Sequence, residues 1–359
     1  MKYNEYFMYK EIFDSPVAFE NVLSNYELIR NAVDFIMEKN IRSIIFVGCG
    51  TSYYAAMVAS YAFNILTSIK TYAYPSSEIY YYDFKSFSKP LLASFSRSGE
   101  TTETVLAVKK ARKRNWYTLS FTNSPESRLA KSSDTVILTN AGEEKSVIMT
   151  KTFSSMIFQA ILLALELGKK SGNSSAQDIL LQARKIPDIA KTLLNNYNRP
   201  LLDVAKKFID KRFTVLGKGP NFGTALEGAL KLRETSYISS NAFSTLEFRH
   251  GPLATVDENL VVIGMLSSIK TFEDELKLYR EISEKNGNII ALAIKDTDYP
   301  EGWTIVKYTP INEILTPVIN IIPIQLLSFY ISVSRGCNPD RPRHLTKVVK
   351  LGNKKGEGL

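Results

Sequence analysis

Three short apolar segments, each followed by a turn and then by a helical pattern, constrain the fold of this chain more than any other feature. The segments are Ser43–Val47, Leu91–Ser96 and Tyr117–Phe121. Short apolar strands that alternate with helices are typical of a parallel sheet covered on both faces. The pattern therefore predicts an α/β fold in which a parallel sheet is flanked by helices, a flavodoxin-like three-layer sandwich.

The same succession recurs about 170 residues further along, which indicates an internal duplication. Phe213–Leu216 with the turn Gly217–Gly219 matches the first segment, Leu260–Met265 with Ser267–Thr271 matches the second, and Asn288–Ala293 matches the third. The 359 residues also suffice for two cores, at about 150 residues per domain. We expect an N-terminal segment (1–26), a first domain (27–170), a helical connector (171–198), a second domain (199–335) and a C-terminal lid tail (336–359).

The charge balance points to anionic partners. The chain has a formal net charge of +9, with 45 Lys and Arg against 36 Asp and Glu. Such a balance favours phosphorylated metabolites, nucleic acids or acidic membrane surfaces. The densest basic run, Lys109–Arg114, falls at the end of a predicted helix, where cations complement the helix dipole. Because no aromatic residues or glycines are interleaved with it, we expect a solvated helix end and no nucleic-acid partner.

Cysteine usage and hydropathy bear on the compartment. Cys49 and Cys337 cannot form a disulfide framework, and there is no signal-peptide pattern, which points to the cytoplasm. The longest apolar stretch, Ile314–Val333, is interrupted by two prolines and by Asn320 and Gln325. We therefore expect a buried strand and helix there, with no membrane partner.

A hydroxyl-rich turn follows the second apolar segment and precedes a predicted helix. It contributes the hydroxyls of Ser96, Ser98 and Thr101. Backbone N–H groups, hydroxyls and the positive end of a helix dipole would suit a phosphate monoester. The alternative is an ordinary Ser/Thr-rich helix cap. A second such turn, Gly48–Ser52, favours the phosphate, because ligands of open α/β sheets bind at strand carboxyl ends.

Cofactor and metal sites are not indicated. The segment Gly217–Gly223 lacks the GxGxxG spacing, so we expect no nicotinamide or flavin cofactor. Two histidines and two unpaired cysteines, with no HExxH spacing, give no reason to expect a metal site.

A charged triplet on one helix face is the strongest candidate for chemistry. Glu227, Lys231 and Glu234 stand at positions i, i+4 and i+7, and His250 follows sixteen residues after Glu234. A carboxylate, an ammonium and an imidazole can open a sugar ring and move a proton between neighbouring carbons. On spacing alone, an exposed Glu–Lys pair and a turn histidine are the simpler explanation, and only the combination favours catalysis.

Together the motifs resemble the isomerase half of glucosamine-6-phosphate synthase, which is built from two sugar isomerase (SIS) domains, and the related SIS-type glucosamine-6-phosphate deaminases. The similarity runs nearly the whole length of the chain. The matching segments are Tyr9–Pro16, Gly48–Ser52, Ser96–Thr101, Ala225–Glu234, Phe248–Pro252 and Arg341–Lys347.

The resemblance implies substrate-binding roles on the first domain. Ser52, Ser96, Ser98 and Thr101 would bind the sugar 6-phosphate. We also place among the substrate-binding residues Gly50, Thr51, Arg97 and Glu227.

The resemblance implies catalytic roles for four further residues. Glu234 would be the base that shuttles the C1–C2 proton, and Lys231 would stabilise the enediol-like or enolamine charge. His250 would assist ring opening by reaching across the interface of a homodimer with a shared active site. Lys347, on the C-terminal lid, would contact the open-chain sugar or form a Schiff base with it.

The chain departs from the family pattern at three places. Arg97 stands where the synthase phosphate loop usually has Gln, and it could add a charge-assisted contact to the phosphate. Met149-Thr150-Lys151 replaces a Ser-Thr-Lys element and lacks one hydroxyl. The glutaminase domain is not expected, because its nucleophilic cysteine follows the initiator methionine and residue 2 here is Lys.

The leading hypothesis is a glutamine-independent, deaminating isomerisation of glucosamine 6-phosphate to fructose 6-phosphate and ammonia. One alternative is aldose–ketose isomerisation of another sugar phosphate, or cleavage of a fructose-amine or galactosamine phosphate. Another is a non-catalytic sugar-phosphate sensor, which would not need Glu234, His250 and Lys347 together. The last alternative is a glutamine-dependent synthase whose glutaminase is a separate chain.

Overall fold

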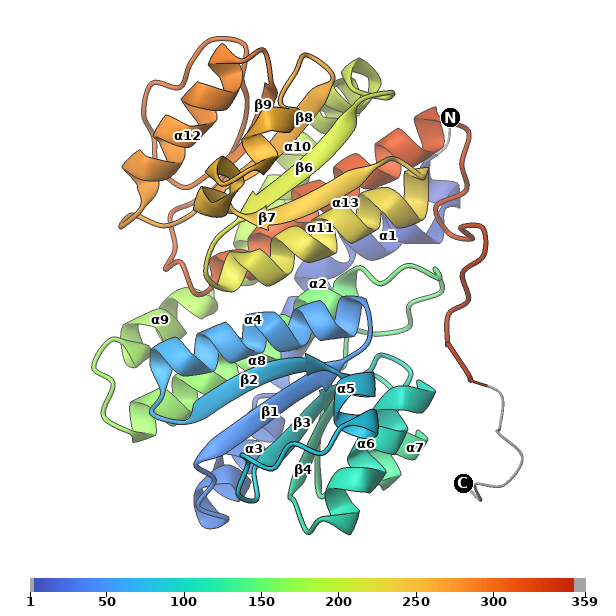
Figure 1. Cartoon of the computed structure of the whole chain (residues 1–359), viewed down its shortest axis with the longest axis vertical. Helices are drawn as coiled ribbons and strands as arrows, with labels where there is room; N and C mark the ends of the chain where they lie inside the picture. The colour runs from blue at the N-terminus through green and yellow to red at the C-terminus, as the bar shows by residue number, and fades with distance from the viewer. Residues whose placement is uncertain (1–2, 352–359) are drawn as a thin grey trace.

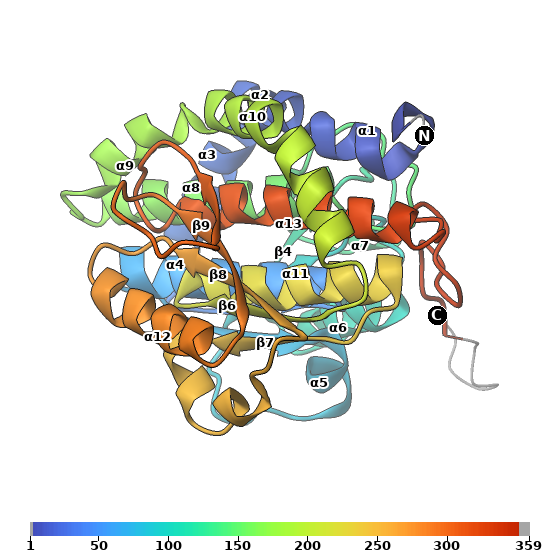
Figure 2. The same cartoon turned by 90° about the horizontal axis from the view of Figure 1, so that it is seen from above.

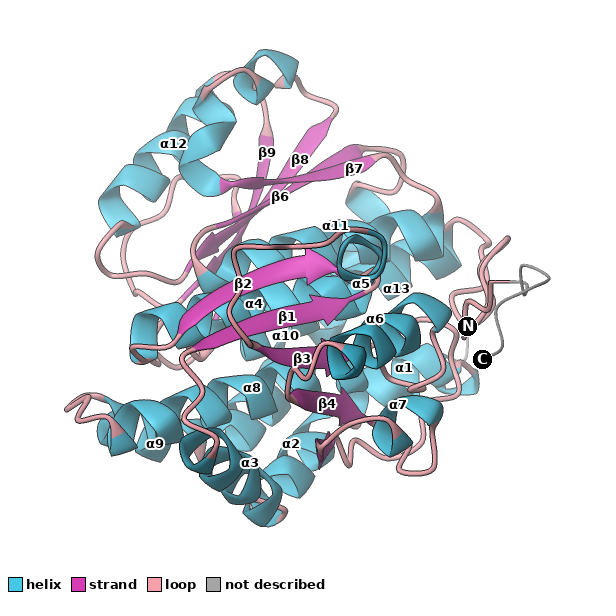
Figure 3. Ribbon diagram, turned by 60° about the horizontal axis from the view of Figure 1, so that its bottom comes forward, coloured by secondary structure: helices cyan, strands magenta, loops and turns pink. Residues whose placement is uncertain are grey.

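The first domain is built on a five-stranded parallel sheet. A computed structural model describes residues 3–351 of the chain. In the first sheet the strands lie in the order β2-β1-β3-β4-β5, and every neighbouring pair is parallel (Figure 3). The strands are β1 (Ser43–Gly48), β2 (Lys70–Pro75), β3 (Leu91–Phe95), β4 (Thr118–Thr122) and β5 (Thr135–Leu138).

The second sheet repeats this topology, which confirms the predicted duplication and α/β class. Its order is β10-β9-β8-β6-β7, again all parallel, so β6 to β10 correspond in turn to β1 to β5. Strand order reverses between β1 and β3, and between β6 and β8, which are the positions where sheets of this kind bind ligands. The strands are β6 (Arg212–Gly217), β7 (Ser240–Ser244), β8 (Leu260–Leu266), β9 (Asn288–Ala293) and β10 (Thr304–Lys307).

Helices precede, connect and cover the sheets. The N-terminal segment holds α1 (Phe7–Phe13) and α2 (Ser15–Ser24), and α3 (Glu27–Glu38) begins the first domain. The connector holds α9 (Ala176–Ala183) and most of α10 (Ile186–Lys207), which continues into the second domain. The first domain holds α4 (Thr51–Leu66), α5 (Ser76–Tyr81), α6 (Thr102–Lys113), α7 (Arg128–Lys131) and α8 (Lys151–Lys170). The second holds α11 (Pro220–Ser236), α12 (Phe272–Glu284), α13 (Thr316–Ser334) and the short 3₁₀ turns Thr245–Arg249 and Pro252–Thr255.

One hydrophobic core joins the inner faces of the two sheets. Figure 1 shows the sheets above and below a central group of helices that includes α4, α11 and α13. Phe46 of β1 and Val215 of β6 belong to the same buried cluster, whereas the outer faces, under α6 and α12, form separate clusters. At Gly223 of α11 a Cβ atom would lie 2.7 Å from the backbone oxygen of Tyr54 on α4. Glycine therefore lets these two helices cross in close contact, so that the domains meet along α4 and α11.

Two helices of this central region are long and apolar enough to cross a membrane, α8 and α13. Of the most apolar 18-residue window in each helix, 94% and 100% is buried within the protein, as in core helices. We predicted a buried strand and a buried helix for Ile314–Val333. The helix is confirmed but the strand is wrong, because the segment from Thr316 onward forms α13. Pro317 lies in the first turn, where it needs no hydrogen-bond donor, and Pro323 is accommodated inside the buried helix.

The N-terminal segment and the C-terminal tail meet beside α13. Figure 2 shows the start of the chain and the end of α13 on the same side of the molecule. The ring of Tyr9 contacts that of Phe329 on α13. Asp340 of the tail accepts hydrogen bonds from the backbone N–H groups of Phe7 and Met8, at 2.8 and 2.7 Å, and so caps α1. The tail then runs down the side of the first domain (Figure 1).

A buried carboxyl on the outer face of the second domain predicts a pH-dependent stability. Glu275 of α12 is 1% exposed, and burial raises its pKa to about 7. The folded protein therefore holds a proton that the unfolded chain loses above pH 4.5, so stability falls as the pH rises from 4.5 to 7. We expect Glu275→Gln to reduce this pH-dependent loss of unfolding free energy by at most about 3 kcal/mol.

Urea unfolding of the two proteins at pH 5 and pH 8 measures the difference. Glu11 and Glu227 titrate in the same direction and remain in both proteins, so only the change in slope is diagnostic. An identical pH dependence in the two proteins would contradict the assignment to Glu275.

Candidate active site

A cavity of about 240 Å³ lies at the carboxyl edge of the first sheet, beside the reversal of strand order between β1 and β3. Its walls come from the two hydroxyl-rich turns, from α11 of the second domain and from the C-terminal tail. Most of the residues singled out from the sequence line it: Gly50, Thr51, Ser52, Ser96, Arg97, Ser98, Thr101, Lys231, Glu234 and Lys347.

The turn after β1 aims the start of α4 at the cavity. Gly50, the N-cap residue, has φ 54°, a left-handed conformation that glycine adopts without steric cost. Thr51 and Ser52 form the first turn of the helix and are 8% and 7% exposed. The positive end of the α4 dipole and two hydroxyls therefore face the cavity, an arrangement that attracts an anion.

The turn after β3 brings the start of α6 to the same cavity. The hydroxyl of Ser96 accepts a hydrogen bond from the backbone N–H of Gly99, and that of Ser98 accepts one from Glu100, both at 3.1 Å. Thr101 is the N-cap residue of α6, and its side chain makes no capping bond to the helix. Thr101 therefore does not act as the helix cap that the alternative explanation requires. The starts of α4 and α6, with their hydroxyls, meet at one cavity.

The charged triplet of α11 forms a buried ionic cluster on the opposite wall. Lys231 is 1% exposed, and its ammonium lies 3.0 Å from Glu227 and 2.7 Å from Glu234. It also donates to the hydroxyl of Thr51 at 3.3 Å, across the domain boundary. The exposed-pair alternative is thus wrong, because the cluster is buried and joins both domains.

Burial and mutual charge set the protonation of this cluster. Burial raises the pKa of Glu227 to about 7, against the opposing effect of the neighbouring ammonium. The carboxylates of Glu227 and Glu234 outweigh burial at Lys231 and raise the pKa of its ammonium, which stays protonated. Glu234 lines the cavity together with Lys231, and its side chain is 20% exposed, so its carboxylate is accessible to act as a base.

Two of the predicted residues do not line the cavity. Glu227 is fully buried behind Lys231, so it meets the ammonium rather than a ligand. His250 is exposed at the end of the 3₁₀ turn Thr245–Arg249 and is absent from the cavity wall. Within one chain, a carboxylate and an ammonium therefore lie beside the two hydroxyl-rich turns, and the imidazole of His250 does not.

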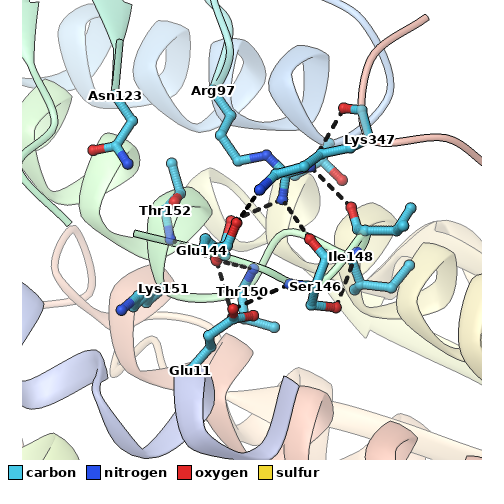
Figure 4. A network of polar contacts seen from close by, with 12 residues as sticks. Glu11, Arg97, Asn123, Glu144, Ser146, Ile148, Thr150, Lys151, Thr152 and Lys347 are labelled. Carbon is cyan, nitrogen blue, oxygen red and sulfur yellow. Dashed lines mark hydrogen bonds and ion pairs between the residues drawn. The ribbon is translucent and has the colours of Figure 1, made fainter. Parts of the chain in front are cut away.

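Arg97 lines the cavity, but its guanidinium is engaged within the protein. It forms an ion pair of 2.9 Å with Glu144 and donates to three backbone oxygens, those of Ser146, Val147 and Lys347 (Figure 4). We expected Arg97 to add a contact to the phosphate, but its guanidinium instead pairs with Glu144 and the three backbone oxygens. The tail residue Lys347 is exposed, and its ammonium donates to the backbone oxygen of Glu144.

The loop before α8 supplies a wall that the sequence did not identify. Val147, Ile148 and Met149 line the cavity. Lys151, in contrast, pairs with Asp14 at 3.2 Å, away from the cavity residues. The signal that could have found this wall was the Met149-Thr150-Lys151 element itself, since the residues just before it complete the loop. Nothing in the sequence marked Glu144.

Comparison with known proteins places these features in a family. The SIS domain model matches residues 38–165 and 209–335, one match over each sheet. The glutamine–fructose-6-phosphate aminotransferase (isomerizing) of Thermococcus kodakarensis is 34% identical over an alignment of 354 residues, which covers 96% of this chain and 58% of that protein. The chain thus spans about 58% of the length of the curated relatives it matches.

Solved structures agree over nearly the whole chain. The C-terminal domain of glucosamine-fructose-6-phosphate aminotransferase from Francisella tularensis has a TM-score of 0.85 at 27% identity, covering 94% of this chain and 98% of that one. A glucosamine-6-phosphate deaminase from Thermotoga maritima has a TM-score of 0.73 at 30% identity, covering 96% of this chain and 100% of that one.

The buried cluster predicts a stability pattern that an exposed pair would not give. At pH 8, Lys231→Met leaves the carboxylate of Glu227 buried without its counter-ion, and we expect a loss of about 3–5 kcal/mol of unfolding free energy. Replacing both charges, in Glu227→Leu with Lys231→Met, should recover most of the loss, since a buried ion pair can be exchanged for apolar residues at little net cost. Urea unfolding followed by circular dichroism measures both. A single variant as stable as the parent, or a double variant no better than the single, would contradict the role of the pair.

Proposed function

The chain belongs to the SIS domain family, and from that premise we propose that it converts glucosamine 6-phosphate and water into fructose 6-phosphate and ammonia. The observation that carries the proposal is the carboxylate of Glu234, held by the buried ammonium of Lys231 on the wall opposite two helix starts that suit a phosphate. The deaminase from Thermotoga maritima, which matches this chain over its full length, supports amino-sugar phosphate as the substrate and a reaction without glutamine. We include in the proposal a cytoplasmic location, which the free thiols Cys49 and Cys337 favour.

The site residues divide the reaction between them. The hydroxyls of Ser52, Ser96, Ser98 and Thr101 and the two helix starts bind the 6-phosphate and orient the sugar toward α11. The fixed phosphate brings the C1–C2 end of the open-chain sugar to Glu234, so that proton transfer takes place within one bound complex.

Glu234 carries the proton from one carbon to the next. Its carboxylate removes the proton from C2 of the open-chain aldehyde, and the protonated carboxyl returns it to C1. The C1 oxygen gains a proton as the nitrogen on C2 loses one, so the aldehyde becomes an alcohol and the C2 amine becomes an imine. Water then adds to the imine and ammonia leaves, which gives the ketone of fructose 6-phosphate. The ammonium of Lys231 holds Glu234 in place and balances the negative charge that develops on the substrate.

The tail and a second copy of the chain complete the site in this proposal. Lys347 lines the cavity on the tail, where its ammonium can meet the open-chain oxygens. His250 lies outside the cavity of its own chain, so we propose that it enters the cavity of the partner in a homodimer and passes a proton to the ring oxygen during ring opening, while the C1 hydroxyl loses its proton.

Purified protein incubated with glucosamine 6-phosphate tests the reaction. We expect ammonia and fructose 6-phosphate to form in equal amounts, and Glu234→Gln to lower the rate at least about 10²-fold, the effect of losing a positioned base. Glu273→Gln, which alters an exposed carboxylate paired with Lys295, is the matched control and should leave the rate unchanged. Binding of the sugar phosphate without turnover would favour a sensor. Turnover of a different sugar phosphate alone would favour another isomerase of the family.

Mixed dimers test the shared site. Glu234→Gln and His250→Ala are each expected to be nearly inactive. When the two variants are unfolded together and refolded at equal amounts, half of the dimers are mixed and carry one site with both native residues. About a quarter of parental activity should therefore return. A mixture as inactive as its components, with mixed dimers verified by mass spectrometry, would contradict a site shared between subunits.

A further inference from the structure

The strongest polar network outside the ionic cluster of α11 is centred on a buried ion pair that the proposed reaction does not use. Arg97 and Glu144 are 8% and 1% exposed, and their charged groups lie 2.9 Å apart (Figure 4). The four donors on the terminal nitrogens of Arg97 meet Glu144 and three backbone oxygens. A buried ion pair with this many hydrogen bonds is held in one geometry.

Glu144 fastens this pair to the start of α8. One of its carboxylate oxygens accepts hydrogen bonds from the backbone N–H of Thr150 at 2.8 Å, from the hydroxyl of Thr150 at 3.0 Å and from the N–H of Thr152 at 3.3 Å. The other oxygen faces Arg97. Burial alone would raise the pKa of Glu144, but the guanidinium and these hydrogen bonds hold it below the usual range, so the carboxylate stays charged.

Arg97 fastens the pair to two separate walls of the cavity. One terminal nitrogen donates to the backbone oxygen of Val147 at 2.9 Å and to that of Lys347 at 3.4 Å. These residues belong to the loop before α8 and to the C-terminal tail, and both line the cavity. The ammonium of Lys347 returns to the backbone oxygen of Glu144, so the tail is tied to the pair at two points (Figure 4).

The N-terminal segment supports the same loop from outside. Glu11 of α1 accepts hydrogen bonds from the backbone N–H groups of Lys145 and Ser146. Asp340, which caps α1, accepts a hydrogen bond at its backbone oxygen from Val147. The loop, the tail and α1 therefore converge on the Arg97–Glu144 pair.

We propose that Arg97 is a positioning residue, and that its ion pair with Glu144 assembles the loop 144–149 and the tail at Lys347 into the wall of the sugar site before substrate binds. In this proposal the hydroxyls and helix starts bind the phosphate, while the guanidinium of Arg97 positions Lys347. The consequence for catalysis rests on the proposed function, but the assembly of the wall in the free protein does not.

Hydrogen exchange of the substrate-free protein tests the assembly. In Arg97→Gln and in Glu144→Gln the amides of residues 343–350 should exchange at least about tenfold faster than in the parent, because the tail loses its tie to the first domain. Arg112→Gln, which removes a surface pair with Asp134, is the matched control and should leave tail exchange unchanged. Arg97→Lys keeps the charge but not the planar fork, so it should loosen the tail too.

Folding of the variants is checked by the exchange of the β3 and β8 amides, which should stay protected. If Glu144→Gln does not fold, Arg97→Gln and Arg97→Lys decide the question. Tail exchange at the parental rate in both Arg97 variants would overturn the proposal.

Phosphate binding separates a positioning role from direct contact with the substrate. Inorganic phosphate, titrated by calorimetry, should bind Arg97→Gln within about twofold of the parent, whereas loss of a direct charge-assisted contact would weaken it about tenfold or more. With glucosamine 6-phosphate, kcat should fall while KM changes little, and Glu144→Gln should show the same split. A tenfold loss of phosphate affinity in Arg97→Gln alone would overturn the proposal in favour of a phosphate ligand. If the protein does not turn over glucosamine 6-phosphate, the proposed function fails, while the exchange and phosphate results still decide the role of Arg97.

Discussion

A lysine buried between two carboxylates, where the two domains meet, is the interaction on which the site depends. Lys231 and Glu227 are 1% and 0% exposed, so either charge alone would be buried without compensation. The third member, Glu234, lines the cavity beside Lys231 and is the most exposed of the three, at 20%, and the ammonium fixes its position at 2.7 Å. The hydrogen bond from Lys231 to Thr51 extends the cluster to the start of α4. One buried charge thus holds the carboxylate that we propose as the base, the domain boundary and the start of α4 in a common geometry.

Duplication gave the chain two equivalent sheet edges, but only one has the chemistry of a phosphate site. The turn after β8 corresponds to the turn after β3. Its Ser267 is 2% exposed and accepts a hydrogen bond from Asn320 at 2.7 Å, so that hydroxyl is committed to the core. The first turn of α12 carries three acidic residues, Glu273, Asp274 and Glu275, against the single Glu103 in the first turn of α6, so the start of α12 is the less favourable of the two for an anion. The second domain instead contributes α11, so the two copies supply different halves of one site.

The sequence alone predicted the features that depend on local order. The central strands were predicted because they are buried on both faces and read as unbroken apolar runs. The edge strands β2, β5, β7 and β10 were missed, since their half-exposed side chains interrupt that signal. The hydroxyl turns and the spacing of Glu227, Lys231 and Glu234 were likewise visible. The engagement of Arg97 was not, because its partner Glu144 lies 47 residues away and no local pattern links them. His250 lies outside the cavity of the single chain, and the entry that we propose for it into a partner's cavity cannot be positioned from one sequence.

The most direct test is a crystal structure of Glu234→Gln with glucosamine 6-phosphate bound. The account predicts the phosphate among Ser96, Ser98, Thr101 and the start of α4, with the C1–C2 end of the sugar within hydrogen-bonding distance of residue 234. The ammonium of Lys231 would remain against Glu227. A sugar whose phosphate lies elsewhere, or whose C1–C2 end points away from α11, would contradict the central claim that the buried cluster presents a base to a phosphate-anchored sugar.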